Sequence, residues 1–509
     1  KMRPGAGESF ILSGAIGSEA LGKDAGALRL QWEPAAEPVE FALLDCFDQP
    51  LCKSGRVLIE AGGQLILLTA EGACCDQPAA RAGNFAADLA PGPVCAALDD
   101  LPPLRSLLAL GRGRMHSCRV ALLDDQDKTQ ARAVLRRLEP EGGGACVTLV
   151  ELQRLRGYDA AYDQLARRLK GAAPRSECAG LCRLLFPGCG GYDPKPAIPI
   201  APDDPVWHAA NAIIAAHIAV ARQNEAGILA DLDTEFLHDY RVALRKVRSV
   251  LSLFRGVYTA PLTEELKAAF AALMEPTGRM RDLDVYLLER PFYFDLLPEG
   301  LHAGLRAMFE LFALERAAAL AALGRRLRSA GYAAEIGRLE EMFDDPDVLS
   351  PGPEAERPAL DYARGLIWKR YRKVCKIAAE IDDATPDHEI HALRIGCKKL
   401  RYLIEFFAPL FPDKDIRKLI KPLKRLQDNL GRFNDYSVQQ ASLRAFQDSH
   451  RAADRATDLA IAQSVGALIA VLHRRQLEER AQVVENFAQF DSDRPRALFR
   501  ALFHEEGEA

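Results

Sequence analysis

Two stretches of this chain carry the same pattern of basic residues at one fixed separation. The first, "HDYRVALRKVR", covers 238–248, and the second, "HALRIGCKKLR", covers 391–401, so that 391 − 238 = 153. A second motif keeps the same shift: "GRMRDLDV" begins at Gly278 and "GRFNDYSV" at Gly431, and 431 − 278 = 153. Two motifs in one register indicate an internal duplication. We therefore predict two similar helical units that pack with pseudo-twofold symmetry.

Each copy of the basic motif predicts an amphipathic helix. At 3.6 residues per turn, about 100° per residue, the basic side chains form one stripe and the apolar ones lie on the opposite side. The stripe of the first copy is His238, Arg241, Arg245 and Arg248, and that of the second is His391, Arg394, Lys398 and Arg401. Like charges at this spacing cost a few tenths of a kcal/mol per pair in an isolated helix. A chain that carries this cost twice is expected to bind an anion that offsets it.

The second copy is followed by a third basic segment, "DKDIRKLIKPLKRLQDNLGR", from Asp413 to Arg432. From Arg394 to Arg425 there are ten basic and three acidic residues, although the whole chain has a formal net charge of -5. The corresponding part of the first copy lacks this charge, because subtracting 153 from Arg417 and Lys418 gives Glu264 and Glu265. The positive charge is local, and we expect the second copy to dominate binding.

The two halves of the chain differ in the periodicity of their apolar residues and in their content of Gly and Pro. Residues 1–190 hold short β-type runs between Gly and Pro residues, and two of them read as hairpins: "GRVLIEAGGQLILLTAEG", with Gly62-Gly63 at the turn, and "AVLRRLEPEGGGACVTLVEL". Residues 191–205 are rich in Pro and Gly and are expected to form a linker. From 206 to 509 the periodicity is helical. We place repeat one at about 206–345 and repeat two at about 358–509.

Ten of the twelve cysteines precede residue 190. In a chain with no visible export signal we expect them to be reduced, and a cytoplasmic protein is the default. The spacing of Cys178, Cys182 and Cys189 does not fit a zinc site, so small buried hydrophobes are the preferred interpretation. The longest apolar run, Leu459 to Leu472, has fourteen residues, which favours a buried helix over a membrane span.

The paired "H-x-x-R-[VI]-x-x-[RK]-K-x-R" helices, each followed by a "G-R-x-x-D" turn, resemble the CHAD domain, the conserved-histidine α-helical domain. The likeness covers about Val206 to the carboxyl terminus. It implies an all-α bundle of two pseudo-symmetric halves that binds inorganic polyphosphate or another polyanion and is not an enzyme. The residues that this resemblance and the basic stripes together assign to binding are His238, Arg241, Arg245, Lys246, Arg248, Arg279, Arg372, Lys373, His391, Arg394, Lys398, Lys399, Arg401, Arg417, Lys421, Lys424, Arg425 and Arg432.

The first half is similar, more faintly, to a CYTH domain, the antiparallel β-barrel of triphosphate-tunnel enzymes. The stretches "FDQPLCKSGRVLIEAGGQLILLTAEG" and "VTLVELQRLRGYDAAYDQLARRL" resemble the central hairpin and the closing strand and helix of that family. CYTH enzymes open with a Glu-x-Glu-x-Lys strand that holds the catalytic metal, whereas "GESFILSGAI" offers Glu8 alone. A site for Mg²⁺ would lack ligands. We expect a multi-domain α+β protein whose first domain is catalytically silent, with no cofactor.

Several alternatives remain open at this level. Nucleic-acid binding would use the same charges, but readers of single strands add aromatic platforms, and Tyr240 and Tyr402 are the nearest ones. The two motif histidines either contact the anion, which would favour binding at mildly acidic pH, or orient their helices through a hydrogen bond. Metal sites at His388 and His391, or at Asp282, Asp284 and Asp435, are disfavoured; the aspartates are expected to hold arginines in place. A triphosphatase with rearranged ligands in the first half is the least favoured alternative. We expect no contact with a membrane.

Overall fold

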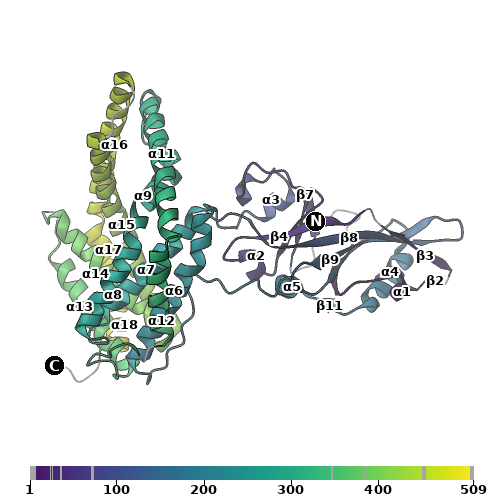
Figure 1. The fold of residues 1–509 in the computed structure, drawn as a ribbon, viewed down its shortest axis with the longest axis horizontal. Helices are drawn as coiled ribbons and strands as arrows, with labels where there is room; N and C mark the ends of the chain where they lie inside the picture. The colour runs from purple at the N-terminus through teal and green to yellow at the C-terminus, as the bar shows by residue number, and fades with distance from the viewer. Residues whose placement is uncertain are drawn as a thin grey trace. The chain divides into compact units, whose positions relative to one another are not determined.

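The computed structural model of the chain describes residues 7–22, 24–25, 27–34, 37–69, 74–345, 348–382, 384–449 and 454–504. Its contacts divide the chain into two compact units, Lys1–Asp193 and Pro194–Ala509. The first unit is built on an antiparallel β-sheet and the second is helical (Figure 1). The predicted α+β class with two unlike halves is confirmed.

The sheet of the first unit has the strand order β11-β1-β10-β9-β8-β4-β5-β6-β7, with β3 paired to β8 and β2 to β3. It is a half-barrel, since the path of paired strands ends at β11 on one side and β7 on the other. The strands are β1 Ser9–Ser13, β2 Asp24–Ala25, β3 Leu28–Pro34, β4 Val39–Asp45, β5 Val57–Ala61, β6 Gln64–Leu68, β7 Cys74–Pro78, β8 Leu108–Leu123, β9 Thr129–Pro140, β10 Val147–Gln153 and β11 Arg175–Ser176. The helices are α1 Ser18–Leu21, α2 Pro50–Lys53, α3 Pro93–Ala97, α4 Asp159–Ala172 and α5 Cys178–Leu185.

Both predicted hairpins are present. Strands β5 and β6 pair antiparallel around Gly62 and Gly63, whose φ angles of 56° and 75° lie in the left-handed region that a two-residue turn of this kind requires. Strands β9 and β10 pair from Val147↔Leu138 to Gln153↔Arg132. Alternation along the strands divides the core: Leu12, Val150 and Leu165 pack with α4 on one face, and Ile11, Leu149 and Leu181 pack with α5 on the other.

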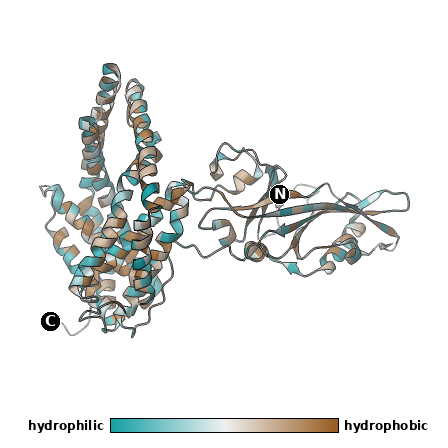
Figure 2. Cartoon of the chain, in the orientation of Figure 1, coloured by the Kyte–Doolittle hydropathy of each residue, from teal (hydrophilic) through white to brown (hydrophobic). Residues whose placement is uncertain are grey.

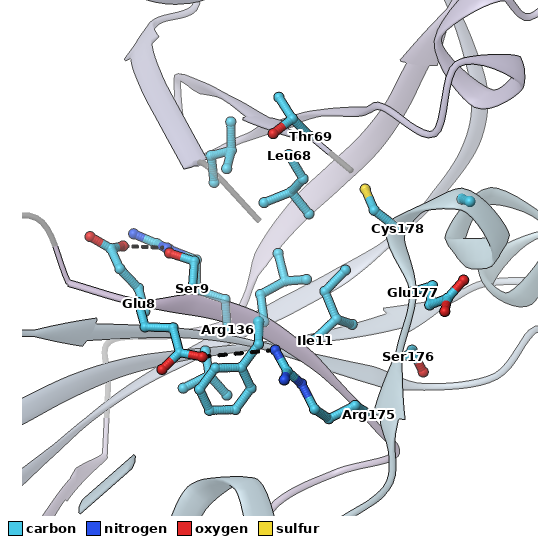
Figure 3. Close-up of a pocket in the computed structure, with 16 residues that line it drawn as sticks. Glu8, Ser9, Ile11, Leu68, Thr69, Arg136, Arg175, Ser176, Glu177 and Cys178 are labelled. Atoms are coloured by element: carbon cyan, nitrogen blue, oxygen red, sulfur yellow. Dashed lines mark hydrogen bonds and ion pairs between the residues drawn. The ribbon is translucent and has the colours of Figure 1, made fainter. Parts of the chain in front are cut away.

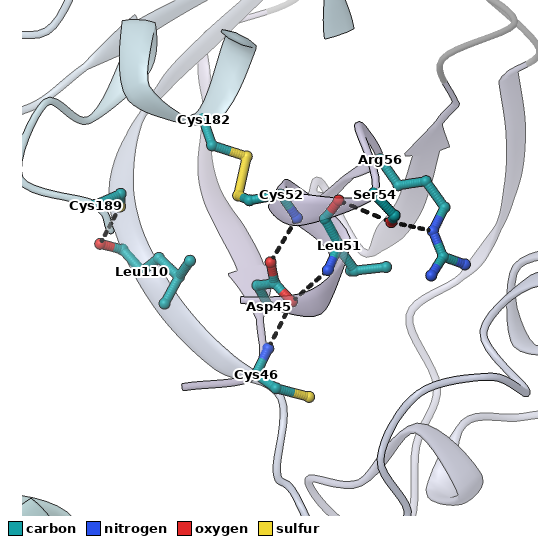
Figure 4. The surroundings of a disulfide bond; sticks show 9 residues. All are labelled: Asp45, Cys46, Leu51, Cys52, Ser54, Arg56, Leu110, Cys182 and Cys189. Atoms are coloured by element: carbon teal, nitrogen blue, oxygen red, sulfur yellow. Dashed lines mark hydrogen bonds between the residues drawn. A yellow bond between two sulfur atoms is a disulfide. The ribbon is translucent and has the colours of Figure 1, made fainter. Parts of the chain in front are cut away.

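Two cysteines of the first unit form a disulfide, which corrects the expectation of fully reduced thiols. Cys52 on α2 and Cys182 on α5 are 130 residues apart in sequence, and their Cα atoms are 6.2 Å apart (Figure 4). The Asp45 carboxylate anchors α2 beside this bond, because it accepts the backbone N–H groups of Leu51 at 3.1 Å and Cys52 at 2.9 Å. Only the tertiary fold brings these cysteines together. Cys178 and Cys189 pack against the same apolar cluster, as predicted.

The second unit contains α6 to α18, and hydrophobic and hydrophilic residues share nearly every one of its helices, as in helices that bury one side (Figure 2). Their bounds are α6 Val206–Leu229, α7 Thr234–Leu253, α8 Ala260–Met274, α9 Gly278–Leu288, α10 Arg290–Asp295, α11 His302–Leu327, α12 Ala330–Asp344, α13 Ala359–Ala379, α14 Asp387–Phe406, α15 Asp413–Ser449, α16 Arg455–Ala481, α17 Val483–Phe490 and α18 Asp493–Phe503.

The duplication predicted from two motifs extends through this whole unit. Five helices of the first half start 153 residues before their counterparts: 206 and 359, 234 and 387, 260 and 413, 302 and 455, 330 and 483. Equivalent helices also contact each other, α7 with α14 and α11 with α16, as a pseudo-twofold axis requires. The Tyr286 hydroxyl even donates to the backbone oxygen of its own counterpart, Gln439, at 3.4 Å.

One break in the symmetry lies at a proline, although Pro422 inside α15 shows that a proline alone does not end a helix of this unit. Helix α15 is continuous from Asp413 to Ser449, whereas its counterpart is divided into α8 and α9 by the 3₁₀ turn Glu275–Thr277. That turn contains Pro276, which lacks the N–H that an α-helix needs and clashes with the preceding turn. The equivalent position in α15 is Asn429, whose side-chain amide instead donates to Glu479. The basic segment of 413–432 therefore lies on one long helix.

Helix α16 is less buried than its apolar sequence suggested. Among the described residues, 455–490 is the one helical stretch that is long and apolar enough to cross a membrane by composition; its most apolar window has a mean hydropathy of 1.4 and is 28% buried. One face packs in the core through Ile461, Val465, Leu468 and Leu472. The predicted buried helix is therefore buried on one side, with Leu459 60% exposed on the other.

Candidate anion-binding site

Helices α7 and α14 carry the two basic motifs and lie against each other at the pseudo-twofold axis. Asp233 caps α7 by accepting the backbone N–H of Glu235 at 2.9 Å and of Phe236 at 3.3 Å. The apolar sides of α7 and α14 are fully buried, for example at Leu244 and Val247 of α7 and at Leu393 and Leu400 of α14. Burial of these faces leaves the basic stripes only partly covered.

Six cations of these two helices form what we call the central cluster: Arg241, Arg245, Lys246, Arg394, Lys398 and Arg401. All six are half-buried. Arg245 and Lys398 hold the same position in the two copies, and they interact electrostatically across the interface. Burial is the largest cause that lowers the pKa of Lys398, and the neighbouring charges of Arg245, Arg394 and Arg401 come next; together they bring it to about 8. The predicted stripes of the two repeats therefore meet in one site.

Few groups offset the charge of the central cluster. The Arg245 Nε donates to the Tyr402 hydroxyl at 3.1 Å, and Arg241 donates to the Thr277 hydroxyl, so neutral oxygens take up these donors. Asp282 interacts electrostatically with Arg241, and Asp435, its counterpart 153 residues later, with Arg394 and Lys398. Glu405 lies 3.3 Å from Arg401. Among the residues that the structure describes, these three carboxylates against six cations leave a surplus of positive charge.

The burial of Lys398, together with the neighbouring positive charges, predicts that Lys398→Met will stabilise the fold. In the folded chain the pKa of Lys398 is about 8, below its ordinary value of 10.5, so the native state disfavours the protonated amine. The penalty is complete below pH 8 and disappears as the pH rises toward 10.5, because the unfolded chain then binds more protons. We expect a gain of about 1–2 kcal/mol at pH 7 after allowance for solvent screening. Chemical denaturation followed by helical circular dichroism measures it.

The exposed Lys421 of α15 supplies the matched control, since Lys421→Met removes a charge that is not buried. It should change the free energy of unfolding by less than about 0.5 kcal/mol. If both variants unfold at the same denaturant concentration as the parent chain, burial of Lys398 does not cost what its lowered pKa implies.

A second group of cations lies on another side of α14. Burial lowers the pKa of Lys399 most, and the positive charges of Arg370, Lys373 and Arg255 lower it further. We call these four residues the α13 cluster. Lys373 and Lys399 were predicted as site residues; Arg255 and Arg370 were not. Arg255 lies two residues after the end of α7, outside the motif, and Arg370 is half-buried beside the exposed Arg372 and Lys373. The sequence signal for Arg370 is its place in the basic run from Lys369 to Lys373, whereas Arg255 has no such signal.

Other predicted site residues are engaged by carboxylates. Arg279 pairs with Glu315, Arg417 with Asp413 and Arg432 with Glu479, each at 2.6 Å. Lys421, Lys424 and Arg425 are exposed on α15, and Arg248 and Arg372 are exposed on α7 and α13. The structure thus brings together only part of the predicted set.

The predicted histidine and aspartate roles have specific counterparts. The His391 Nδ1 lies 2.8 Å from Asn434 Oδ1, which fits the helix-orienting alternative, while His238 is half-buried on α7. Asp284 is fully buried and accepts the Arg316 Nε at 2.6 Å, so this aspartate holds an arginine as predicted. Over the described residues, no group of three or more His, Cys, Asp or Glu side chains is arranged to hold a metal ion.

In the first unit, the single carboxylate of the strand expected to carry the catalytic motif is already engaged. Glu8 accepts a hydrogen bond from Lys170 Nζ at 2.6 Å, and Arg175 lies 3.9 Å away. Arg56, which directly precedes β5, forms two hydrogen bonds to Asp100 at 2.8 and 2.7 Å. These side chains make ion pairs within the unit.

Comparison with known protein families finds one that matches part of this chain. The family model of the CHAD domain matches residues 212–444. The uncharacterized protein Rv2226 of Mycobacterium tuberculosis is 29% identical over 258 residues, which cover 47% of this chain. The match covers 46% of Rv2226, so the chain spans about half the length of that curated relative.

Two solved structures are similar. The CHAD domain of the plant Ricinus communis has 24% identity and a TM-score of 0.49, covering 60% of this chain and 98% of that one. PptA from Streptomyces chartreusis has 16% identity and a TM-score of 0.45, covering 56% and 99%. The antiparallel half-barrel of the first unit is consistent with a CYTH-like domain. Residues 212–444, which include both basic motifs and the central cluster, form a CHAD domain.

Proposed function

We propose that this CHAD domain binds inorganic polyphosphate at the central cluster without chemical conversion. The observation that carries the proposal is the proximity of Arg245 and Lys398: equivalent cations of the two repeats are held within interaction range, where burial first and then the neighbouring positive charges lower the pKa of the lysine. A bound polyanion offsets this repulsion. Arginine can hold one phosphate through two hydrogen bonds, and lysine adds a mobile charge.

The membership of residues 212–444 in the CHAD family supports this choice of anion, because the resemblance implies polyphosphate-binding proteins. Within the proposal, the chain is cytoplasmic and associates with polyphosphate granules through this domain. The CYTH-like unit is proposed to be catalytically silent, and incubation of the full chain with tripolyphosphate and Mg²⁺ or Mn²⁺ tests this. Release of phosphate above the rate of a heat-inactivated sample would contradict it.

A competition titration of the full chain tests the choice of ligand. Long-chain polyphosphate and RNA of matched total charge compete at several salt concentrations. Because bound phosphates release condensed counterions, the logarithm of the affinity should fall with the logarithm of the salt concentration, with a slope of about −4 if most of the six cations each neutralise one phosphate. We expect polyphosphate to bind more tightly than RNA at every salt concentration. Tighter RNA binding would favour the nucleic-acid alternative, and a slope near zero would remove both.

The pKa of Lys398 predicts how binding depends on pH. In the free protein this amine is protonated below pH about 8 and loses its proton above it. A polyanion binds the protonated form, so binding above pH 8 must take up a proton and affinity should fall by up to about tenfold per pH unit. Calorimetric titrations between about pH 7 and 10 measure the fall and the proton uptake. If Lys398→Met shows the same loss of affinity above pH 8, another group is responsible.

A further inference from the structure

The α13 cluster brings Arg255, Arg370, Lys373 and Lys399 together without a partner of opposite charge. Among the residues that the structure describes, none of these four side chains forms an ion pair or a hydrogen bond. Lys399 interacts electrostatically with the other three, all of them positive. Burial first, and then the charge of Arg255, lower the pKa of Arg370, which is half-buried. Because a buried charge is costly unless it is paired, this cluster is expected to take up an anion from solution.

Packing that involves no charge holds the segments of the cluster together. The Tyr362 hydroxyl of α13 donates to the backbone oxygen of Arg255 at 3.0 Å. Helices α13 and α14 approach closely at Gly396, where an added Cβ would lie 3.2 Å from Val374, the residue after Lys373. The fold therefore sets the positions of the cations, and their mutual repulsion is a cost that it carries.

The other repeat shows that the fold does not need cations at these positions. At the equivalent positions, 153 residues away, Arg255, Arg370 and Lys373 are replaced by Ala408, His217 and Val220. His217 is neutral at pH 7, because burial lowers its pKa to about 4, and its Nδ1 donates to the Ile213 backbone oxygen at 2.7 Å. Three of the four cations thus occur in one repeat only, which fits a role in binding better than a role in folding.

One exposed face of α14 joins the α13 cluster to the central cluster. Lys398 and Lys399 are consecutive, so their side chains leave the helix about 100° apart, one toward each cluster. Ile395 lies between these two directions and is 37% exposed, and His391, one turn earlier, is exposed as well. The surface between the two amines is open to solvent at these residues, so a chain of phosphates can run across it.

We propose that the α13 cluster is a second phosphate-binding site, and that one long polyphosphate chain occupies it together with the central cluster, whereas a chain of three phosphates does not span both. This binding mode rests on the proposed function and specifies the ligand of the same domain as a long chain. One ligand that links two sites makes the second contact intramolecular, so the two sites together bind more tightly than either alone. The α13 cluster should add about two units to the salt slope expected from the central cluster.

A cavity of about 690 Å³ in the first unit is less suited to phosphates (Figure 3). Three glutamates outnumber two arginines in its lining, and Figure 3 shows Glu8 beside Arg175. The two arginines lie on opposite faces of the sheet, because Arg136 pairs with Leu149 and Arg175 with Leu12, which belong to different core clusters. A polyanion needs a surplus of cations, so tripolyphosphate and longer chains are expected to bind the helical unit.

A triple variant that gives the second repeat the neutral residues of the first tests the proposal: Arg255→Ala, Arg370→His and Lys373→Val. The same fold already holds these residue types at the equivalent positions, so the variant should keep its helicity, which circular dichroism checks. Binding to the full chain is measured at about pH 7.5 and about 0.1 M salt with tripolyphosphate and with polyphosphate of about 100 phosphates. We expect the long chain to bind at least about tenfold more weakly than it binds the parent and to lose about two units of salt slope. Tripolyphosphate fills the central cluster first, because six cations attract it more than four, so its affinity should change less than about threefold.

The matched control is Arg338→Ala, Arg417→Ala, Arg474→Ala, which removes three exposed arginines that pair with carboxylates on their own helices. It should weaken binding of the long chain less than about threefold. Three results would each overturn the proposal: parent-like affinity of the cluster variant for the long chain, the same loss in both triple variants, or the same loss for both ligands in the cluster variant.

A variant whose central cluster is alanine separates this proposal from the proposed function. If the central cluster binds polyphosphate, that variant loses affinity for both ligands, whatever the α13 cluster does. If only the role of the α13 cluster is wrong, the central variant still shows this loss, and the cluster variant binds the long chain as the parent does. Unchanged binding of both ligands by the central variant would instead contradict the proposed function.

Discussion

Replacing Arg241, Arg245, Arg394 and Lys398 with alanine is expected to weaken polyphosphate binding at least about a thousandfold at 0.1 M salt. Each residue removed takes away about one phosphate contact, so the dependence of affinity on salt should lose about three of its four units of slope. Helicity should be retained, because all four side chains lie on the half-buried stripes and not on the buried faces of α7 and α14. Fluorescence anisotropy of labelled polyphosphate at three or more salt concentrations measures both quantities.

A control with the same change in net charge separates this site from a general electrostatic effect. Arg338, Arg417, Lys418 and Arg474 are exposed and each already pairs with a carboxylate on its own helix. Their replacement with alanine should weaken binding less than about tenfold. If both quadruple variants lose the same affinity, the ligand senses total charge and the central cluster is not a site.

Loss of the Cys52–Cys182 disulfide is expected to destabilise the first unit by about 5 kcal/mol. The bond closes a loop of 130 residues, and a covalent link of that length removes much of the conformational entropy of the unfolded chain. The mass of the parent chain should be two units lower than that of its fully reduced form. Thermal unfolding with and without reductant should show a lower transition for the β-rich unit and an unchanged one for the helical unit.

Cys52→Ala should reproduce the effect of the reductant, whereas Cys95→Ala removes a thiol that forms no disulfide and should leave the transition of the β-rich unit nearly unchanged. An intact chain whose mass does not change on reduction, or a Cys52→Ala variant as stable as Cys95→Ala, would show that these two cysteines are not linked.

The repeat was predictable because helical periodicity and a fixed offset are properties of local sequence. The motif that begins at His238 and His391 has a shift of 153, and the motif at Gly278 and Gly431 has the same one. The starts of α6 and α13, and of α11 and α16, repeat this shift. The hairpin at Gly62 was predictable for the same reason, since its turn needs two residues of positive φ. Each of these features is determined within a few residues.

The remaining features depend on which surfaces meet, and spacing does not encode that. Cys52 and Cys182 come together only when α2 and α5 pack on one sheet. Arg417 and Arg432 look like further members of the basic stripe, but Asp413 and Glu479 engage them. Arg255 and Arg370 join Lys399 through three different segments. Neither the carboxylate partners of the α15 arginines nor the cations that gather beside α13 could therefore be read from spacing.

A double-mutant cycle on Arg245 and Lys398 tests most directly whether the two repeats form one polyphosphate site. Affinities are measured for the parent chain, Arg245→Ala, Lys398→Ala and the double variant. If one polyanion bridges both residues and relieves their repulsion, the double variant should lose less binding free energy than the sum of the single losses, by at least about 0.6 kcal/mol. Losses that add within about 0.3–0.5 kcal/mol are typical of independent positions and would contradict a shared site.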